Sequence, residues 1–522
     1  MKDKHRFEDV EEFNLILEQV MKGECPSMIG PLAEKAWRAR AMIVEALVGA
    51  KWLKFEGRSI KTLGFYYHRF RNGGTERVLT QLGSLLAELR DQSGQPKYRV
   101  VLISDEPPNE EDYPVSPRVL REELPSHEKS TAKKYALREE KWQEIIAKHA
   151  IDVVFYSLWL YPNLIWDLLS IKRSERAPAF VLHAHNTCAL MYGMNWLSVK
   201  EMQNIYSLAD GTVTLSEIDR LYWSRCNSRS VYIPNPCFVK ASESRRAKYG
   251  KHILWLARIS GEKQPLEIPR IMKEVYARDP EIICHVVGAY DVNLQKKLEK
   301  RIVAEGLTEN VIMEGFHVDV TPYYECCSLF LLTSRYEGFT LTLYEAAAHG
   351  LPTVMYEMPW LAYNELIEGA ISVPQLDAEA AAEAIVKLVN DPDEWQRRSD
   401  AIYDSACRYE EMDITTCWTS LIESLEKGVM PNALRFDRRI EVLLNEIDDF
   451  RDSALKLSAR DERDKSQLNF ELDYTRDSTF FRLGRSITWL PRKLRGGVRC
   501  WKENGGKYTF YRVLYHLHIR DE

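Results

Sequence analysis

Short apolar runs alternate with longer amphipathic stretches over most of the chain. Many of these runs are continuously apolar, which is typical of β-strands that are covered on both faces. Alternation of such strands with helices predicts parallel sheets joined by right-handed crossovers, an α/β architecture. The predicted strands are 60–67, 98–103, 152–156, 180–183, 211–215 and 231–233 in the first half of the chain, and 253–257, 282–287, 311–313, 329–333 and 353–356 in the second.

The strand pattern stops and starts again near the middle of the chain. Residues 238–250 are mostly polar, and a new apolar strand begins at Ile253. We interpret this change as a linker between two doubly wound, Rossmann-like domains, 59–240 and 241–430. Ligands of such sheets bind beyond the carboxyl ends of the strands, so two sheets facing each other would form one deep cleft.

Three further segments flank these domains. Residues 1–58 are expected to form a helical extension. Within 431–478, apolar residues recur at steps of three and four. This spacing predicts either a coiled coil that joins copies of the chain through 436–460, or one amphipathic helix packed on its own domain.

The last segment, 479–522, is basic and aromatic. It carries 10 Lys and Arg against 3 Asp and Glu, in a chain whose total charge is −6. Aromatic side chains between cations suit the headgroup layer of an anionic membrane. A basic arm that joins subunits is the alternative interpretation.

Composition excludes several classes of protein. The 522 residues are 45 % hydrophobic and 28 % charged, as in soluble globular proteins, and the net charge gives no reason to expect nucleic acid as a partner. Ten cysteines without zinc-ligand spacing, and a charged start without a signal peptide, predict a cytoplasmic protein. The apolar run 151–170 is about as long as a membrane span, but Asp152, Pro162 and Asp167 favour a strand, a turn and a core helix.

One predicted strand–turn–helix segment contains two glutamates whose carboxylates could reach the same ligand. Glu337 lies in the turn after strand 329–333, and Glu345 lies on the second turn of a helix that runs from about Thr340 to His349. Side chains on a helix tilt toward its N-terminus, where free backbone N–H groups favour phosphate or hydroxyl groups. This arrangement suits a phosphorylated, polyhydroxylated ligand. A capping glutamate and an ordinary surface glutamate are the simpler alternative.

Two cations follow another predicted strand. Arg258 and Lys263 lie in the loop and helix start after strand 253–257. Fixed cations stabilise the charge that develops on a departing nucleoside diphosphate, Arg as a two-pronged donor and Lys as a point charge. Taken alone, the pair could equally be two solvated surface residues.

Together these features resemble the retaining glycosyltransferases of family 4, which have the GT-B fold, and especially those of bacterial surface-polysaccharide pathways. The R-x4-K loop at 258–263 and the segment EGFTLTLYEAAAHGLP that starts at Glu337 carry the resemblance. Four more motifs support it between about residues 60 and 425: Asn72-Gly-Gly-Thr-Glu-Arg77, His183-Ala-His185-Asn186, Ala209-Asp210-Gly-Thr-Val-Thr-Leu-Ser216 and Ile233-Pro-Asn-Pro236.

The resemblance implies roles for the candidate residues. Glu345 would hold the ribose hydroxyls of a nucleotide-sugar donor and Glu337 its sugar, and Arg258 and Lys263 would bind the diphosphate. His185 would lie near the acceptor, unless it is only a strand-end histidine that the backbone satisfies. The donor-binding set is Gly73, Gly74, Arg258, Lys263, Glu337, Gly338, Phe339, Thr340, Leu341 and Glu345, and the catalytic set is His185, Arg258, Lys263 and Glu337.

The resemblance also implies a reaction. The anomeric configuration would be retained, by front-side attack in which the leaving phosphate takes the proton of the acceptor hydroxyl. No metal or other cofactor is expected, because Arg258 and Lys263 would neutralise the diphosphate. The only D-x-D sequence, Asp391-Pro-Asp393, matches the start of a helix rather than a metal-binding loop. The acceptor would be a glycan or lipid-linked molecule, met in the cytoplasm or at the inner face of the plasma membrane.

Two departures from the family pattern leave the donor's base and sugar open. The usual Gly-x-Gly reads Val287-Gly288-Ala-Tyr290, and the usual Gly-rich turn after strand 353–356 reads Tyr356-Glu-Met-Pro-Trp-Leu-Ala-Tyr-Asn-Glu365. The main alternative function is a non-catalytic GT-B accessory subunit, and another is an epimerase or phosphorylase of the same fold. Loss of a charged site residue would favour the accessory subunit, but the chain has all four of them: Arg258, Lys263, Glu337 and Glu345.

Overall fold

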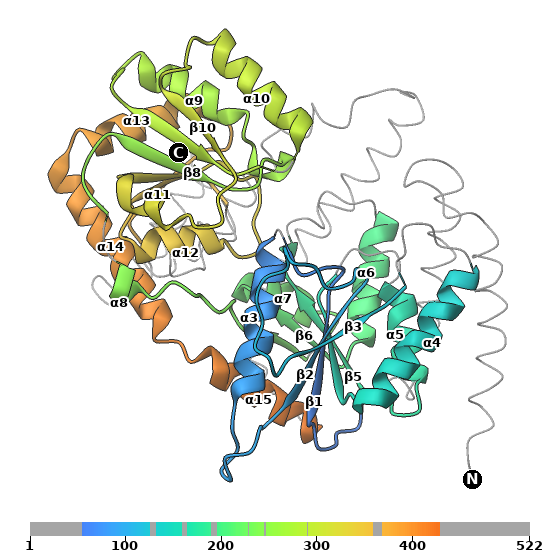
Figure 1. Cartoon of the computed structure of the whole chain (residues 1–522). Coiled ribbons are helices and arrows are strands. Elements are labelled where there is room, and N and C mark those ends of the chain that lie inside the picture. The colour runs from blue at the N-terminus through green and yellow to red at the C-terminus, as the bar shows by residue number, and fades with distance from the viewer. Residues whose placement is uncertain are drawn as a thin grey trace, which may run out of the picture. The chain divides into compact units, whose positions relative to one another are not determined.

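The computed structural model describes residues 55–71, 73–125, 132–158, 164–188, 196–227, 229–244, 247–289, 291–358 and 368–428 (Figure 1). Contacts between residues divide these ranges into two α/β units. The first unit contains 55–238, 338–341 and 412–428, and the second contains 239–337 and 342–411, less the gaps just given. Residues 1–54 and 429–522 lie outside the described residues, and with them nearly all of the predicted helical extension 1–58 and all of the predicted segments 431–478 and 479–522.

The first unit is built on a seven-stranded, wholly parallel sheet with the order β3-β2-β1-β4-β5-β6-β7. Its central strands are continuously apolar and buried, as expected for a sheet covered on both faces. The strands are β1 (Thr62–Tyr66), β2 (Arg99–Ser104), β3 (Leu120–Glu123), β4 (Val153–Tyr156), β5 (Ala179–Ala184), β6 (Gly211–Thr214) and β7 (Ser230–Tyr232).

Helices cover both faces of this sheet. Apolar residues of α3 and α15 pack against one face, where Trp418 of α15 contacts Phe155 edge-on with ring centres 5.1 Å apart. On the other face, Trp142 of α4 meets Tyr66 of β1 at 5.5 Å. The helices of this unit are α3 (Gly74–Glu88), α4 (Ala132–His149), α5 (Leu164–Arg173), α6 (Trp196–Leu208), α7 (Glu217–Ser224) and α15 (Ile414–Glu426).

The second unit has a six-stranded parallel sheet with the order β10-β9-β8-β11-β12-β13. Its strands are β8 (His252–Leu256), β9 (Ile283–Val287), β10 (Val311–Gly315), β11 (Leu329–Leu332), β12 (Thr353–Tyr356) and β13 (Ala370–Val373). In this order β8 and β11 lie side by side at the centre, so the loops that follow them open on the same edge of the sheet.

Helices again lie on both sides of this sheet, with α9, α10 and α13 on one side and α11 and α12 on the other (Figure 1). A short 3₁₀ helix, η3 (Gly261–Lys263), follows β8. The described helices of the second unit are α8 (Ala241–Ser244), α9 (Glu267–Tyr276), α10 (Val292–Ala304), α11 (Thr321–Cys326), α12 (Leu341–Ala348), α13 (Ala378–Val389) and α14 (Pro392–Glu410).

The sequence-based fold class is confirmed, and all eleven predicted strands are present within two residues of their expected ends. The pattern missed β3 and β13, which are edge strands. The apolar run 151–170 contains strand β4 and the start of α5, as predicted. Asp391 caps α14 by accepting a hydrogen bond from the Glu394 N–H at 2.9 Å, which confirms the expected helix start.

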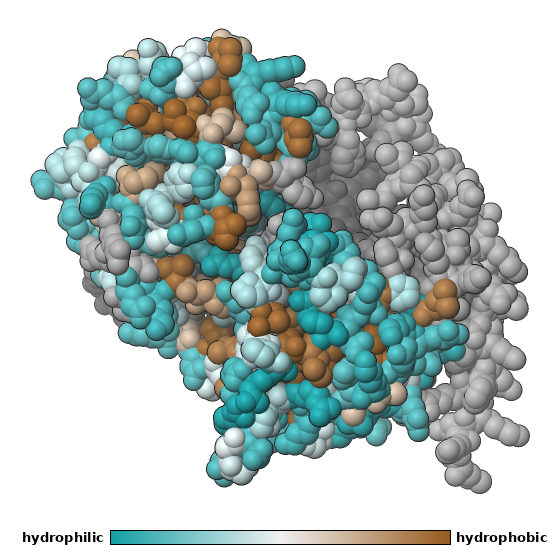
Figure 2. Space-filling model, in the orientation of Figure 1, coloured by the Kyte–Doolittle hydropathy of each residue, from teal (hydrophilic) through white to brown (hydrophobic). Residues whose placement is uncertain are grey.

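Most of the apolar side chains of both units are buried, and hydrophilic residues dominate the face shown in Figure 2. Large apolar residues that remain exposed include Val292 and Val303 of α10, and Phe316 and Val318 in the loop after β10. Among the described helices, none is both long enough and apolar enough to span a membrane.

Candidate functional site

Glu337 lies in the loop that connects β11 to α12. Its carboxylate is buried, and two donors meet at one of its oxygens. The Lys263 Nζ lies 2.6 Å from Glu337 Oε1, and the Ser334 hydroxyl donates a hydrogen bond to the same oxygen at 2.6 Å. The structure therefore joins two residues for which the resemblance implied different parts of the donor, Lys263 for the diphosphate and Glu337 for the sugar.

Glu345 occupies the buried face of α12, and α11 helps to fix its carboxylate. The Tyr324 hydroxyl donates to Glu345 Oε2 at 2.9 Å, and both side chains are buried. The Tyr324 ring also stacks on His349, with ring centres 4.9 Å apart and planes inclined by 12°. Because His349 Nδ1 lies 2.7 Å from the Glu345 carbonyl oxygen, it ties the stacked tyrosine to the last turn of α12.

Arg258 and Lys263 stand at opposite ends of the turn that follows β8. The Arg258 side chain is 43 % exposed, with its Nη2 3.5 Å from Glu262 Oε1, whereas the Lys263 side chain is 17 % exposed. This difference separates their local roles. Lys263 belongs to the packed interior of the loops, and Arg258 remains at the surface, where a polyanion can reach it.

One glycine of the incomplete Gly-x-Gly pattern has a clear steric reason. Gly288 follows β9 with φ at +139°, a conformation that other residues rarely adopt. A Cβ at this position would lie only 1.9 Å from the Ala257 carbonyl oxygen at the end of β8. The close approach of these two strand ends thus depends on Gly288, although the second glycine of the pattern is absent.

In the first unit, His185 follows β5 and pairs with His183. Its Nε2 lies 3.2 Å from His183 Nδ1. Burial lowers the pKa of His183 well below its ordinary value and the pKa of His185 to about 3. Both rings are therefore neutral at pH 7, so His185 can form a hydrogen bond with a hydroxyl but does not bring a positive charge.

Gly73 and Gly74 begin α3 after β1. Gly73 is the N-cap residue of this helix, and a Cβ there would lie 2.1 Å from Glu76 Oε2. Glu76 is buried in the first turn of α3, where the helix dipole stabilises its negative charge. A larger residue at 73 would therefore displace the Glu76 carboxylate from its place at the helix start. Glu76 belongs to the sequence motif, but sequence reasoning did not select it.

Sequence reasoning also missed the residues that hold the charged groups in place. These are Tyr324, Ser334, His349 and a pair of glutamines at 264 and 375. Gln264 directly follows Lys263, so proximity in sequence could have suggested it. Tyr324 and Gln375 belong to other loops and helices, and only the fold brings them to the site.

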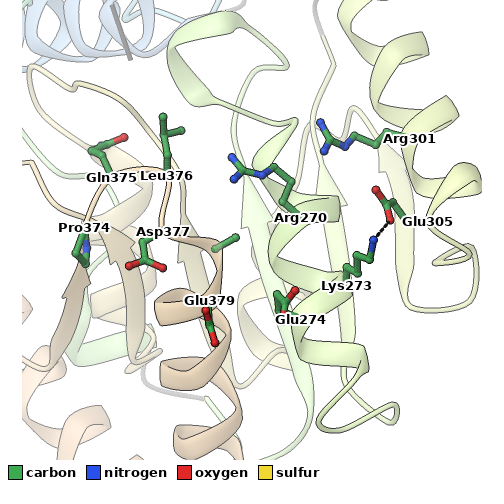
Figure 3. Close-up of a pocket in the computed structure, with 11 residues that line it drawn as sticks. Arg270, Lys273, Glu274, Arg301, Glu305, Pro374, Gln375, Leu376, Asp377 and Glu379 are labelled. Carbon is green, nitrogen blue, oxygen red and sulfur yellow. Dashed lines mark ion pairs between the residues drawn. The ribbon is translucent and has the colours of Figure 1, made fainter. Parts of the chain in front are cut away.

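A polar pocket of about 620 Å³ in the second unit lies beside this network, and Gln375 is one of its lining residues (Figure 3). It lies between α9, the end of α10 and the loop from β13 to α13, and Lys273 and Glu305 form an ion pair of 2.7 Å in its wall. None of the sequence-predicted site residues lines it. Within the described ranges, no three His, Cys, Asp or Glu side chains gather so that they could hold a metal ion.

Comparison with known proteins bears most directly on the second unit. Residues 250–391 match the family model described as glycosyl transferases group 1. The chain is also similar to the poly(glycerol-phosphate) alpha-glucosyltransferase of Bacillus subtilis (strain 168), with 23 % identity over 172 residues. This match covers 33 % of the chain but only 25 % of the relative, so the chain spans a quarter of that protein's length.

Solved structures show the same fold over most of the described residues. Sucrose-phosphate synthase from Thermosynechococcus elongatus has a TM-score of 0.59 and 17 % identity, and the match covers 70 % of this chain and 99 % of that one. Anabaena Alr3699/HepE in complex with UDP-glucose has a TM-score of 0.56 and 15 % identity, with the same shares covered. The chain therefore has the GT-B fold, and residues 250–391 of its second unit are similar to the group 1 glycosyl transferases.

Proposed function

We propose that this protein transfers a sugar from a nucleoside diphosphate sugar to a hydroxyl of a glycan or lipid-linked acceptor, with retention of configuration. The observation that carries the proposal is the cluster of Lys263, Ser334 and Glu337 at the carboxyl edge of the second sheet. It lies in the part of the chain that matches the family model, and it joins a half-buried cation to a buried carboxylate at a strand–loop–helix junction.

The charges of this cluster suit the two halves of such a donor. Diphosphate oxygens compete with the Glu337 carboxylate for Lys263, and Arg258 adds a second cation from the surface of the same turn. When Lys263 turns to the phosphates, Glu337 becomes an acceptor for sugar hydroxyls. Backbone N–H groups at the start of α12 provide further donors, and the Glu345 carboxylate on the same helix suits the two ribose hydroxyls.

The same residues account for retention without a divalent metal. Two fixed cations stabilise the diphosphate as the bond to the anomeric carbon breaks, and the departing phosphate oxygen accepts the proton of the attacking hydroxyl on the same face of the sugar. His185, neutral at pH 7, orients that hydroxyl through a hydrogen bond. The Bacillus subtilis relative is named a glucosyltransferase, and the HepE structure contains UDP-glucose; both support transfer of a sugar from a nucleotide donor.

A nucleotide screen tests the proposal. The protein is melted with UDP, GDP and ADP and with their glucose, mannose and N-acetylglucosamine conjugates. A nucleotide at 100 times its dissociation constant is expected to raise the free energy of unfolding by about 2.7 kcal/mol. Transfer with the conjugate that binds should persist in EDTA, and NMR of the product should show the donor's anomeric configuration. If no nucleotide shifts the melting curve, the proposal is wrong.

For the acceptor, we infer that the enzyme works at an anionic membrane, on the cytoplasmic side. This inference rests on the basic and aromatic residues of 479–522, where each basic residue near an anionic surface contributes ~1 kcal/mol of binding. The heptad spacing over 436–460 adds a proposed contact between copies of the chain.

A truncation tests the membrane proposal. The full chain should co-sediment with vesicles that contain phosphatidylglycerol, whereas a chain ending at residue 478 should remain in solution and keep its activity on a soluble acceptor. Vesicles of phosphatidylcholine alone are the control, since they lack the anionic charge that the basic segment would bind. Equal sedimentation of the two chains with anionic vesicles would leave the segment without this role.

A further inference from the structure

The loops that end four strands of the second sheet meet at two glutamines. Gln264 lies in the loop after β8, and Gln375 lies in the loop after β13. Gln264 Nε2 donates to Gln375 Oε1 at 2.8 Å and to the Thr333 carbonyl oxygen, after β11, at 2.9 Å. Gln375 Nε2 donates to the carbonyl oxygens of Ser334 at 3.0 Å and Glu357, after β12, at 3.3 Å. We call these two side chains the glutamine pair.

The backbone beside both glutamines is strained. Gln264 itself has φ at 49°, and Leu376, which follows Gln375, has φ at 64°. This left-handed region favours glycine, and other residues remain in it only where the surrounding structure over-determines them. Strain in the two loops that the glutamine pair joins indicates that side-chain hydrogen bonds, rather than backbone preference, hold these loops.

The glutamine pair is connected to the charged residues of the site through two buried hydroxyls. The Thr333 hydroxyl donates to the Lys263 carbonyl oxygen at 2.7 Å, which fixes the backbone of the lysine. The Ser334 hydroxyl donates to Glu337 Oε1 at 2.6 Å. Because the glutamine pair binds the carbonyl oxygens of both Thr333 and Ser334, it sets the position of the two hydroxyls as well.

We propose that the glutamine pair is the positioning element of the donor site, holding the loops after β8 and β11 so that Lys263 and Glu337 meet a nucleoside diphosphate in one arrangement. The proposal rests on the proposed function. Gln264 and Gln375 act through Thr333 and Ser334. The Gln375 amide accepts at Oε1 and donates from Nε2, so neither a carboxylate nor an apolar side chain replaces it.

Single and double variants separate positioning from folding. Gln375→Leu keeps approximate size and removes the amide. Gln264→Gly removes the other amide and at the same time permits φ of 49° without strain, so its melting temperature should stay near that of the unchanged protein. The matched control is Gln396→Leu, which removes an amide from the exposed side of α14, where it donates to Asp400 at 3.0 Å.

Binding of UDP, GDP and ADP is then measured by calorimetry for each protein. Each single variant should raise the dissociation constant of the nucleotide that the unchanged protein prefers by about 5-fold or more. This is the effect expected for the loss of hydrogen bonds that each contribute ~1 kcal/mol. The double variant should bind about as weakly as either single variant, because both amides serve one connection. Gln396→Leu should bind normally.

Each other outcome points to a different error. If the unchanged protein binds nucleotide and both single variants bind it equally well, the positioning role is wrong while the proposed function stands. If Gln264→Gly loses melting temperature in proportion to affinity, the pair serves folding alone and the proposal is overturned. If the unchanged protein binds none of the three nucleotides, the proposed function fails and this inference with it.

Discussion

Replacing Glu345 with alanine is expected to lower kcat/KM for sugar transfer by about 10²–10⁴-fold, mainly through a higher KM for the donor. A hydrogen bond to a charged group is worth ~1.5–3 kcal/mol, and two ribose hydroxyls would form two of them. These contacts are present in both the ground state and the transition state, because the ribose is remote from the reacting bond. Their loss therefore raises KM more than it lowers kcat.

The measurement needs a check on stability, since Glu345 also accepts a buried hydrogen bond from Tyr324. Alanine leaves that hydroxyl without its acceptor, at a cost of ~1–3 kcal/mol. Tyr324→Phe removes the hydroxyl and provides the comparison, because it loosens the carboxylate without deleting it and should raise KM far less. Glu379→Ala on α13, where the side chain is 78 % exposed, is the matched control for losing a carboxylate. An unchanged KM in folded Glu345→Ala would contradict the ribose role.

Most of the fold could be predicted because its strands are buried on both faces. Strands such as β4 and β11 are uninterrupted apolar runs, so their pattern is visible without any knowledge of tertiary contacts. The edge strand β3 reads Leu-Arg-Glu-Glu and is only partly buried, so no hydropathy pattern distinguishes it from a loop. Its pairing with β2 becomes visible only when the register of the sheet is known.

The placement of α15 shows a second limit. Its apolar residues, including Trp418, belong to the core of the first unit, although the helix follows the elements of the second unit in sequence. Amphipathic spacing predicts that such a helix buries one face, but it does not say against which sheet. Chain order alone would assign α15 to the nearest core, and the return to the first sheet depends on tertiary packing.

The charged residues of the candidate site could be predicted from the sequence, but the hydrogen bonds and ion pairs between them could not. Position after a strand identifies Lys263 and Glu337 as residues of one sheet edge, because parallel strands share their carboxyl ends. Which carboxylate each cation contacts depends on loop conformation, and so does the assembly of Gln264 with Gln375 from loops 111 residues apart. Hydrogen bonds between loops have no periodic signal, so a single sequence contains no trace of them.

Replacing Lys263 with methionine is expected to lower kcat by about 10³-fold, because the cation acts most strongly on the additional negative charge that develops as the diphosphate departs. The same change removes the partner of the buried Glu337 carboxylate, and breaking such a pair costs ~3 kcal/mol of stability.

The double variant Lys263→Met, Glu337→Gln separates the two effects. With no buried charge left unpaired, its melting temperature should recover most of the loss seen in Lys263→Met, while its kcat should remain as low or lower. A low kcat in a double variant of nearly normal melting temperature would show that Lys263 acts in the transfer reaction itself. If kcat instead recovers together with melting temperature, the ion pair of Lys263 and Glu337 is structural, and the stabilising charge at the diphosphate must come from Arg258 alone.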